Sequence, residues 1–156
     1  MIFATTGTQL PFDRFIRMLD DLAPLIDEEI IAQTGASSFH PQHIKTVGLL
    51  PPDEFDQLFS QARLIVAHAG MGTILSALQA QKPLIIFPRI AALGEHRNEH
   101  QLATAAKMRE QGMVYVATDQ AELKSLLLNP DLHPLHTISE TASESLVQSI
   151  TDFIEN

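Results

Sequence analysis

Residues 89–101 form the segment of this sequence whose side chains are best suited to bind a charged ligand. Two arginines, two histidines, an asparagine and a glutamine fall within it, in a chain whose net charge is −9. Such groups recognise anions and hydroxyl groups through directional hydrogen bonds. A helix predicted over 97–111 places Arg97, Asn98 and Gln101 on one face, and Arg89 precedes it. The segment predicts a polar binding site or, alternatively, a helix start whose charged residues face water.

Histidines in and near this segment raise the question of a metal ion or a catalytic base. His96 and His100 are four residues apart, a spacing that can hold a metal ion on a helix. The zinc-protease pattern requires a glutamate directly after the first histidine, but Arg97 stands there. No third ligand is evident unless His68 approaches, so we predict no metal site. His68 is a candidate catalytic base or, more simply, a hydrogen-bonded histidine at the end of a strand.

A glycine-containing segment, Gly70-Met71-Gly72-Thr73, lies between an apolar run and a helical pattern. Unpaired N–H groups at the start of a helix favour an anion, and glycines let a phosphate approach the backbone closely. The segment is not the dinucleotide-binding pattern, because Leu75 stands where a third glycine is needed, and it lacks the lysine of a P-loop. It predicts an anion site or, equally, a tight turn in which Thr73 caps the helix.

A third segment, Gly7-Thr8-Gln9, follows the first apolar run and precedes the first helical pattern. It offers backbone donors and a hydroxyl group to a phosphate, although taken alone it is better explained by ordinary turn chemistry before Pro11. All three segments come directly after predicted strands. Because ligands of open parallel sheets bind beyond the carboxyl ends of the strands, we expect the three to converge on one edge.

The elements that must position these segments alternate between short apolar runs and longer helical patterns. Strands are predicted over 1–6, 29–33, 44–49, 64–67, 83–88 and 113–116, with a polar turn region over 35–43. Helices are predicted over 12–22, 53–61, 70–79, 97–111, 119–127 and 139–154, the second with Asp53 as its N-cap. This order is typical of an α/β fold. We expect a single domain, residues 1–156, with a Rossmann-like parallel sheet and helices on both faces.

Composition excludes several classes of protein. The 156 residues include 10 Lys and Arg against 19 Asp and Glu, so neither a nucleic acid nor an anionic lipid surface is expected as the main partner. The absence of cysteine rules out disulfides and thiol nucleophiles, and it fits a cytoplasmic location. No apolar run approaches the ~20 residues of a membrane span, and the first residues lack the basic start of a signal peptide.

Three segments together resemble a known family. They are His68-Ala69-Gly70-Met71-Gly72-Thr73-Ile74-Leu75, Lys82-Pro83-Leu84-Ile85-Ile86-Phe87-Pro88-Arg89 and Glu95-His96-Arg97-Asn98-Glu99-His100-Gln101, and residues 6–13 also match the family's start. From residue 1 to about residue 118 the chain resembles the C-terminal, donor-binding domain of glycosyltransferase family 28. It looks most similar to stand-alone members, namely the catalytic subunit of the eukaryotic UDP-GlcNAc transferase of dolichol-linked glycan synthesis and bacterial exopolysaccharide subunits.

The resemblance implies the C-terminal half of a GT-B enzyme that binds a UDP-sugar as its donor substrate, and we expect no cofactor besides. The residues that the resemblance implies for donor binding are Gly7, Thr8, Gln9, His68, Gly70, Met71, Gly72, Thr73, Arg89, Arg97, Asn98 and Gln101. Among them the glycines and threonines would hold the diphosphate, and residues 97, 98 and 101 would face the sugar. Residues 47–50 would lie near the uracil.

The implied reaction is inverting transfer of a hexose-type sugar from UDP to a lipid-linked acceptor, with bacterial exopolysaccharide synthesis as the favoured setting. In two-domain relatives the N-terminal domain binds the acceptor and docks on the membrane. The resemblance therefore implies a separate, membrane-associated partner subunit that recruits this chain to the inner face of the membrane. In many relatives a glutamate holds the ribose hydroxyls, but Ser76 stands at that position. A non-catalytic nucleotide-sugar-binding or regulatory module is the alternative that this difference leaves open.

Overall fold

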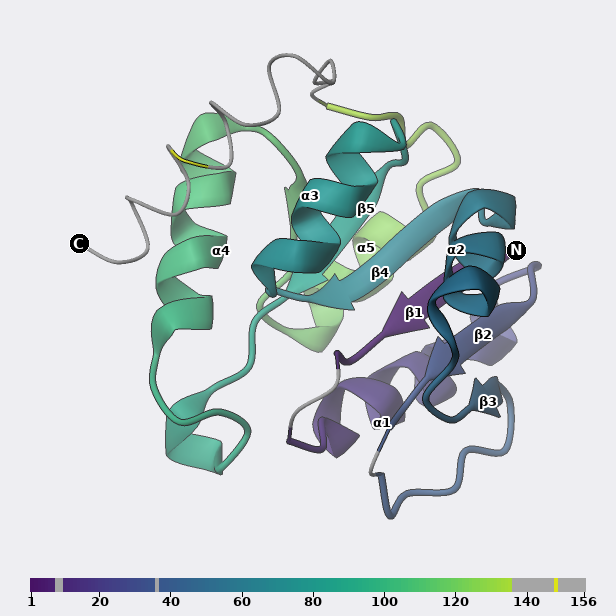
Figure 1. Ribbon diagram of the computed structural model, residues 1–156. Helices are drawn as coiled ribbons and strands as arrows, with labels where there is room; N and C mark the ends of the chain where they lie inside the picture. The colour runs from purple at the N-terminus through teal and green to yellow at the C-terminus, as the bar shows by residue number, and fades with distance from the viewer. Residues whose placement is uncertain (8–9, 36, 136–147, 149–156) are drawn as a thin grey trace.

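A single parallel sheet organises the chain. The structure is a computed structural model that describes residues 1–7, 10–35, 37–135 and 148. Within these residues the strands are β1 (Ile2–Thr5), β2 (Ile30–Gln33), β3 (Lys45–Val47), β4 (Leu64–His68), β5 (Leu84–Phe87) and β6 (Tyr115–Val116). They pair in the order β3-β2-β1-β4-β5-β6, every pair parallel. This arrangement confirms the predicted Rossmann-like α/β fold (Figure 1).

Helices cover both faces of this sheet. They are α1 (Asp13–Leu22), α2 (Pro52–Gln61), α3 (Met71–Gln79), α4 (His100–Gln111) and α5 (Gln120–Leu127), with short 3-10 turns η1 (Ala23–Leu25) and η2 (Ala91–Leu93). Two hydrophobic clusters separate the faces, one including α2, α3 and α4 and the other including α1 and α5. The four residues of each of the strands β1, β2 and β5 are buried, as expected for parallel strands covered on both faces.

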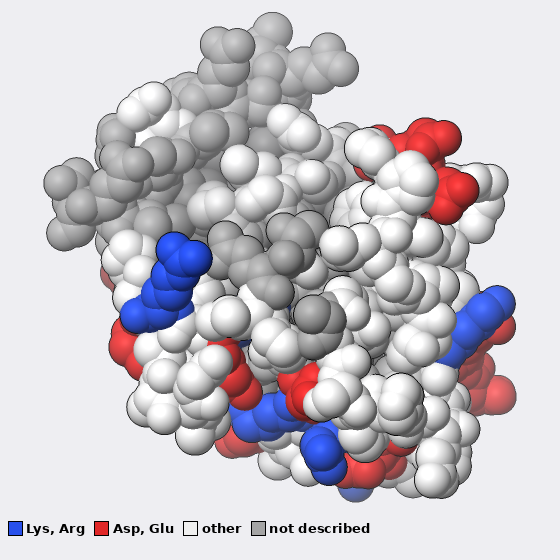
Figure 2. Space-filling model, turned by 60° about the horizontal axis from the view of Figure 1, so that its bottom comes forward, with Lys and Arg blue, Asp and Glu red and all other residues white. Residues whose placement is uncertain are grey.

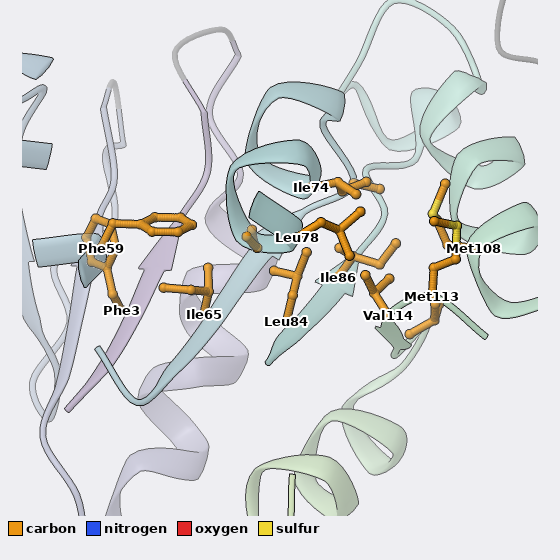
Figure 3. Packing of buried hydrophobic residues seen from close by; sticks show 14 of the residues in the cluster. Phe3, Phe59, Ile65, Ile74, Leu78, Leu84, Ile86, Met108, Met113 and Val114 are labelled. Atoms are coloured by element: carbon orange, nitrogen blue, oxygen red, sulfur yellow. The ribbon is translucent and has the colours of Figure 1, made fainter. Parts of the chain in front are cut away.

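The first cluster fixes α3 and α4 against the sheet next to the segments of interest. Ile74 and Leu78 of α3 pack with Ile86 of β5, and Met108 of α4 joins the same cluster (Figure 3). On the opposite face, the rings of Phe12, Phe15 and Phe87 lie 5.2–6.0 Å apart between centroids. Aromatic rings at such distances contribute stabilisation beyond the apolar area that they bury. The loops that follow β1, β4 and β5 therefore start from strands that are held firmly by packing on both faces of the sheet.

A buried carboxylate organises the long connection before β3. Asp20 of α1 accepts hydrogen bonds from the backbone N–H groups of Gln42, His43 and Ile44, at 2.7–3.2 Å. Burial raises the pKa of the Asp20 carboxyl, but the hydrogen bonds from these N–H groups outweigh burial and hold the pKa below its ordinary value of 3.8. The end of the predicted turn region, at Gln42 and His43, thus has its backbone donors satisfied by a side chain from another element.

Several predicted boundaries are wrong for physical reasons. α2 begins one residue before Asp53, with Pro51 as its N-cap, because a proline is well suited to the first helical position and Pro52 occupies it. α3 has Gly70 as its N-cap, so Thr73 is a residue of the helix and not its cap. The predicted strand over 44–49 reduces to β3, and the predicted helix over 139–154 lies outside the described residues, apart from residue 148. No helix in the described part of the chain is long and apolar enough to cross a bilayer.

Candidate functional site

The three segments that carry polar side chains meet at one edge of the sheet, as predicted. Thr5 of β1 pairs with Gln33 of β2 on one side and with Ala67 of β4 on the other, so these strands end in register. After β1 the chain crosses to β2, whereas after β4 it crosses in the opposite direction to β5. Such a reversal of strand order leaves a crevice beyond the carboxyl ends, which is where ligands bind in this class of fold.

A pocket of about 610 Å³ fills this crevice. Its lining comes from the ends of β1, β2 and β4, from the N-terminal parts of α2 and α3, from the segment after β5 and from the start of α4. The residues are Thr5, Thr6, Gly7, Gln33, Leu50, Pro52, Phe55, Asp56, His68, Gly70, Met71, Gly72, Thr73, Ser76, Arg89, His96 and Gln101. A volume of this size lies in the range of small-molecule sites and has room for a nucleotide.

The His68 ring lies close to two glycines of this pocket. A Cβ atom on Gly7 would lie 2.7 Å from Nε2 of His68, and one on Gly70 would lie 2.6 Å from the same atom. Glycine at both positions therefore leaves room for this imidazole, which would have to move if either residue carried a Cβ atom. Gly7 also has a φ of +77°, which side-chain-bearing residues rarely adopt. Gly72 differs, because a Cβ atom there would meet nothing within 4 Å.

Gln101 connects the segments after β4 and β5 to this histidine. Its Oε1 accepts the backbone N–H of Ala69 at 3.2 Å and the backbone N–H of Arg89 at 3.0 Å. Its Nε2 donates to Nδ1 of His68 at 3.0 Å. The side chain is only 6% exposed, so the amide is committed to these contacts. Burial, followed by the charges of Arg89 and His96, lowers the pKa of His68 to about 4, and the ring is neutral at pH 7.

Arg89 acts as a clamp on the backbone around the pocket. It is 1% exposed, and its guanidinium donates to the carbonyl oxygens of Thr6, Leu10, Pro11 and Glu95. The guanidinium carbon also lies 4.9 Å from the centroid of the Phe12 ring. Burial lowers the pKa of Arg89, an effect that the Glu95 carboxylate opposes. An arginine remains charged at neutral pH even so, and the pocket floor therefore carries a fixed positive charge.

The predicted binding residues of the segment over 89–101 do not gather as a group. α4 begins at His100, so Arg97 and Asn98 precede the helix and do not share a helical face with Gln101. Both are exposed and absent from the pocket lining, and the Asn98 side chain accepts the backbone N–H of His100 at 3.0 Å. The predicted helix over 97–111 therefore starts three residues late, and the short turn η2 precedes it at residues 91–93. Thr8 and Gln9 lie outside the described residues.

His96 and His100 do not form the helical pair that could hold a metal ion. His96 is not on a helix, which removes the spacing argument for a pair with His100. Among the residues that the structure describes, no group of three or more His, Cys, Asp or Glu side chains is placed to hold a metal ion. His96 instead lines the pocket, and its charge contributes to the lowered pKa of His68.

Several lining residues were missed by sequence reasoning. Gln33 ends β2 as a polar residue in a buried strand and accepts a hydrogen bond from Thr5 at 3.0 Å. Its position at the end of a strand was the signal that could have revealed it. Phe55 and Asp56 of α2 also line the pocket, and they carry no local motif. Their placement depends on α2 packing beside β1, where Phe55 makes an edge contact with Phe3 at 5.4 Å.

Charge on the surface is mixed in sign. Figure 2 shows the molecule turned so that the bottom of Figure 1 comes forward, and Lys and Arg side chains lie next to Asp and Glu side chains in its lower part. Above them, the described surface has a broad white area without Lys, Arg, Asp or Glu. The net charge of −9 is therefore not gathered into one acidic surface on this side. An anionic ligand that approaches here does not face a field of one sign.

Comparison with known proteins identifies the family. Residues 1–156 match the family model described as the glycosyltransferase family 28 C-terminal domain. The chain belongs to glycosyltransferase family 28. It is a glycosyltransferase domain of that family, and the resemblance drawn from the three segments is confirmed.

Relatives of this family 28 domain include proteins named as transferase subunits. The chain is 30% identical over 94 residues to the UDP-N-acetylglucosamine transferase subunit ALG13 of Eremothecium gossypii, which covers 60% of this chain and 46% of that protein. It is 26% identical over 128 residues to human ALG13, covering 75% of this chain but 11% of that protein. The chain thus spans less than half the length of these curated relatives.

Solved structures agree on the fold of the domain. An NMR solution structure of ALG13 superposes with a TM-score of 0.63 at 19% identity and covers 96% of both chains. The glycosyltransferase of kitacinnamycin gives a TM-score of 0.63 at 16% identity, covering 99% of this chain and 39% of that one. MurG of Acinetobacter baumannii gives 0.53 at 16% identity, covering 96% of this chain and 49% of that one.

Proposed function

We propose that this family 28 domain is the donor-binding subunit of an inverting glycosyltransferase and takes a hexose-type sugar from UDP. The observation that carries the proposal is the pocket at the reversal point of strand order, where the start of α3 meets a buried positive charge. Gly70 has no side chain with which to cap α3, so the first-turn N–H groups of that helix remain available to an anion.

The diphosphate is the part of the donor that these groups fit. The helix dipole of α3 and the Arg89 charge both favour a negative ligand, and Gly72 leaves open space into which a phosphate can move. Neutralisation of charge at this place stabilises UDP as it departs, which is half of the task in inverting transfer. The other half is a base for the acceptor hydroxyl. We assign that base to a partner, since Nδ1 of His68 is engaged by Gln101.

A separate partner subunit would bring the acceptor and the contact with the membrane. Support comes from the family, whose member ALG13 is named as a subunit of a transferase. We propose a lipid-linked acceptor, and bacterial exopolysaccharide synthesis as its setting. Affinity purification from the native host, followed by assay of the recovered complex with a panel of UDP-sugars, tests this step. Sugar transfer by the chain without any co-purified protein would contradict it.

Calorimetric titration of the purified chain tests donor binding directly. We expect affinity to increase from uridine to UMP to UDP, because each phosphate adds contacts at the start of α3. ADP serves as the base control and should bind more weakly than UDP. At a concentration of 100 times its dissociation constant, UDP should raise the free energy of unfolding by about 2.7 kcal/mol. The absence of both heat and a thermal shift with UDP and UDP-sugars would overturn the proposal.

Ser76 supports a second candidate function, a regulatory module that binds nucleotide-sugars without catalysis. Its side chain lines the pocket where the family resemblance leads us to expect a glutamate for the ribose. A hydroxyl offers a weaker partner for two ribose hydroxyls than a carboxylate does. Transfer activity of the recovered complex distinguishes the two candidates. A complex that binds UDP-sugar but transfers no sugar to lipid-linked acceptors favours the regulatory module.

A further inference from the structure

The side-chain amide of Gln101 has only one orientation that suits its surroundings. Two backbone N–H groups, those of Ala69 and Arg89, point at one end of the amide, and donors require an oxygen there. The NH₂ group must then face Nδ1 of His68. The reverse orientation would place the NH₂ group against two donors. The network of hydrogen bonds, and not the shape of the side chain, therefore decides the assignment.

This orientation dictates where the imidazole proton sits. Because the NH₂ group donates to Nδ1, that nitrogen must present its lone pair, and the single proton of a neutral ring lies on Nε2. Nε2 lies against the backbone of Gly7 and Gly70 at the pocket, and no hydrogen bond joins it to another described residue. The two charged or titratable groups that act on the ring, Arg89 and His96, both oppose a second proton.

We propose that Gln101 is a positioning residue that locks His68 in the Nε2–H tautomer, so that His68 serves as a neutral hydrogen-bond donor to the anionic diphosphate and not as a base. The inference rests on the proposed function for the identity of the anion. It changes the role predicted for Gln101, since an amide committed to Ala69, Arg89 and His68 acts on the donor through the histidine and does not itself face the sugar.

Substitution Gln101→Glu provides a selective test, because it keeps the shape and both backbone contacts but reverses the third bond. A carboxylate accepts from Ala69 and Arg89 as before, yet it can only accept from Nδ1, which must then carry a proton. The matched control is Gln111→Glu, which makes the same change at an exposed position of the same helix. Side-chain ¹H–¹⁵N correlation spectra report which imidazole nitrogen is protonated, with His68→Asn used to assign the signals.

At pH 7 and without ligand, we expect the wild-type chain and Gln111→Glu to show an unprotonated Nδ1 and a protonated Nε2. Gln101→Glu should show a protonated Nδ1, and its His68 pKa should rise from about 4 to at least the ordinary value of 6.5. A protonated Nδ1 in the wild type would overturn the proposal even if Gln101→Glu fails to fold. An unprotonated Nδ1 in folded Gln101→Glu would overturn it as well.

Addition of UDP separates this inference from the proposed function. If UDP binds, the Nε2–H signal of His68 should shift on saturation while Nδ1 stays unprotonated. Calorimetric binding without any shift at Nε2 would overturn the donor role and leave UDP binding intact. If calorimetry shows no UDP binding at all, the proposed function fails, whereas the spectra of the free protein still decide whether Gln101 sets the tautomer.

Discussion

Arg14 and Glu95 form a two-pronged ion pair although 81 residues separate them in the chain. Nε of Arg14 lies 2.9 Å from Oε2 of Glu95, and a terminal guanidinium nitrogen lies 2.9 Å from Oε1. Oε1 also accepts the backbone N–H of Ile90 at 2.9 Å. The pair thereby attaches the segment after β5 to α1, directly beside the Arg89 clamp.

Replacement of Glu95 by glutamine should weaken this attachment. Glu95→Gln keeps one acceptor for Ile90 but loses the charge opposite Arg14, and the carboxylate is 91% buried as a side chain. We expect a loss of about 1–3 kcal/mol in the free energy of unfolding, measured by urea denaturation. A double-mutant cycle with Arg14→Met isolates the pair. Additive losses in that cycle would show that the two residues stabilise the fold independently.

The buried Asp20 carboxylate predicts a specific dependence of stability on acid. Its pKa is lower in the folded chain than the ordinary 3.8, so the unfolded chain binds a proton more readily. Its contribution to stability is fully present above pH 3.8 and declines as the pH falls through the folded pKa. Asp20→Asn should therefore lower stability near pH 7 by about 1–3 kcal/mol and flatten the slope at acid pH. Asp21→Asn, exposed on the same helix, is the control, and it should leave both unchanged.

Two glycines of the α3 start predict opposite outcomes for the same substitution. Gly70→Ala places a Cβ atom within 2.6 Å of His68 Nε2, so the ring must move or the fold must lose about 1–3 kcal/mol. Gly72→Ala meets nothing in the free protein and should instead stabilise α3 by up to about 1 kcal/mol.

Gly72→Ala should stabilise the free protein but impair the binding of UDP. If a phosphate occupies the space beside Gly72, the added methyl group should lower the affinity for UDP by roughly tenfold and leave the affinity for uridine unchanged. Gln79→Ala, exposed near the end of the same helix, is the control for a general effect on α3. Equal UDP affinity in Gly72→Ala and the wild type would place the phosphates elsewhere in the pocket.

Ser76 and Asp56 together predict how the ribose is held. Asp56 is the one carboxylate among the described residues that line the pocket. If Asp56 binds the ribose in place of the glutamate expected at position 76, Asp56→Asn should lower the affinity for UDP about fivefold and leave the affinity for inorganic pyrophosphate unchanged. Ser76→Glu should then raise UDP affinity little in the wild type but restore it in Asp56→Asn. A large gain from Ser76→Glu alone would indicate that the natural site has lost its grip on the ribose.

Arg97 and Asn98 remain predicted contacts of the donor sugar. Both side chains are exposed beyond the pocket lining, a position from which they can reach only the outer part of a UDP-sugar. Arg97→Ala and Asn98→Ala should each lower the affinity for a UDP-sugar roughly fivefold more than the affinity for UDP. Asn98→Asp, which keeps an acceptor for the His100 N–H, controls for a change at the start of α4. Equal losses for UDP and UDP-sugar would show that neither residue contacts the sugar.

Periodicity and strand-end chemistry were sufficient to predict the sheet, its parallel direction and the edge at which the pocket lies. The reason is that β1, β4 and β5 are buried on both faces, so that their apolar runs stand out from the sequence around them. The start of α4 was mispredicted because residues 97–99 have acceptable helix propensity. The preceding η2 turn, whose C-cap is Gly94 with a φ of +75°, diverts the chain before His100.

Roles inside the pocket were harder to predict, because they depend on contacts between distant segments. Gln101 and Arg89 are polar residues near strand ends, and by type alone both are suitable for a ligand. In the structure, Gln101 accepts from two backbone N–H groups, and Arg89 donates to four carbonyl oxygens. A sequence shows which residues have hydrogen-bonding groups, but not how many of those groups the fold itself consumes.

The Arg89 clamp holds the backbone around the pocket through main-chain atoms, so the shape of the pocket does not depend on which side chains stand at the clamped positions. It contacts main-chain carbonyl groups at Thr6, Leu10 and Pro11, which every amino acid possesses, and so these contacts place no demand on the identity of the side chains there. Leu10 and Pro11 are exposed, so their side chains can change while the backbone keeps its anchoring points. A library randomised at residues 10 and 11 should retain folding far better than one randomised at residue 89. The clamp is in this sense a source of evolvability.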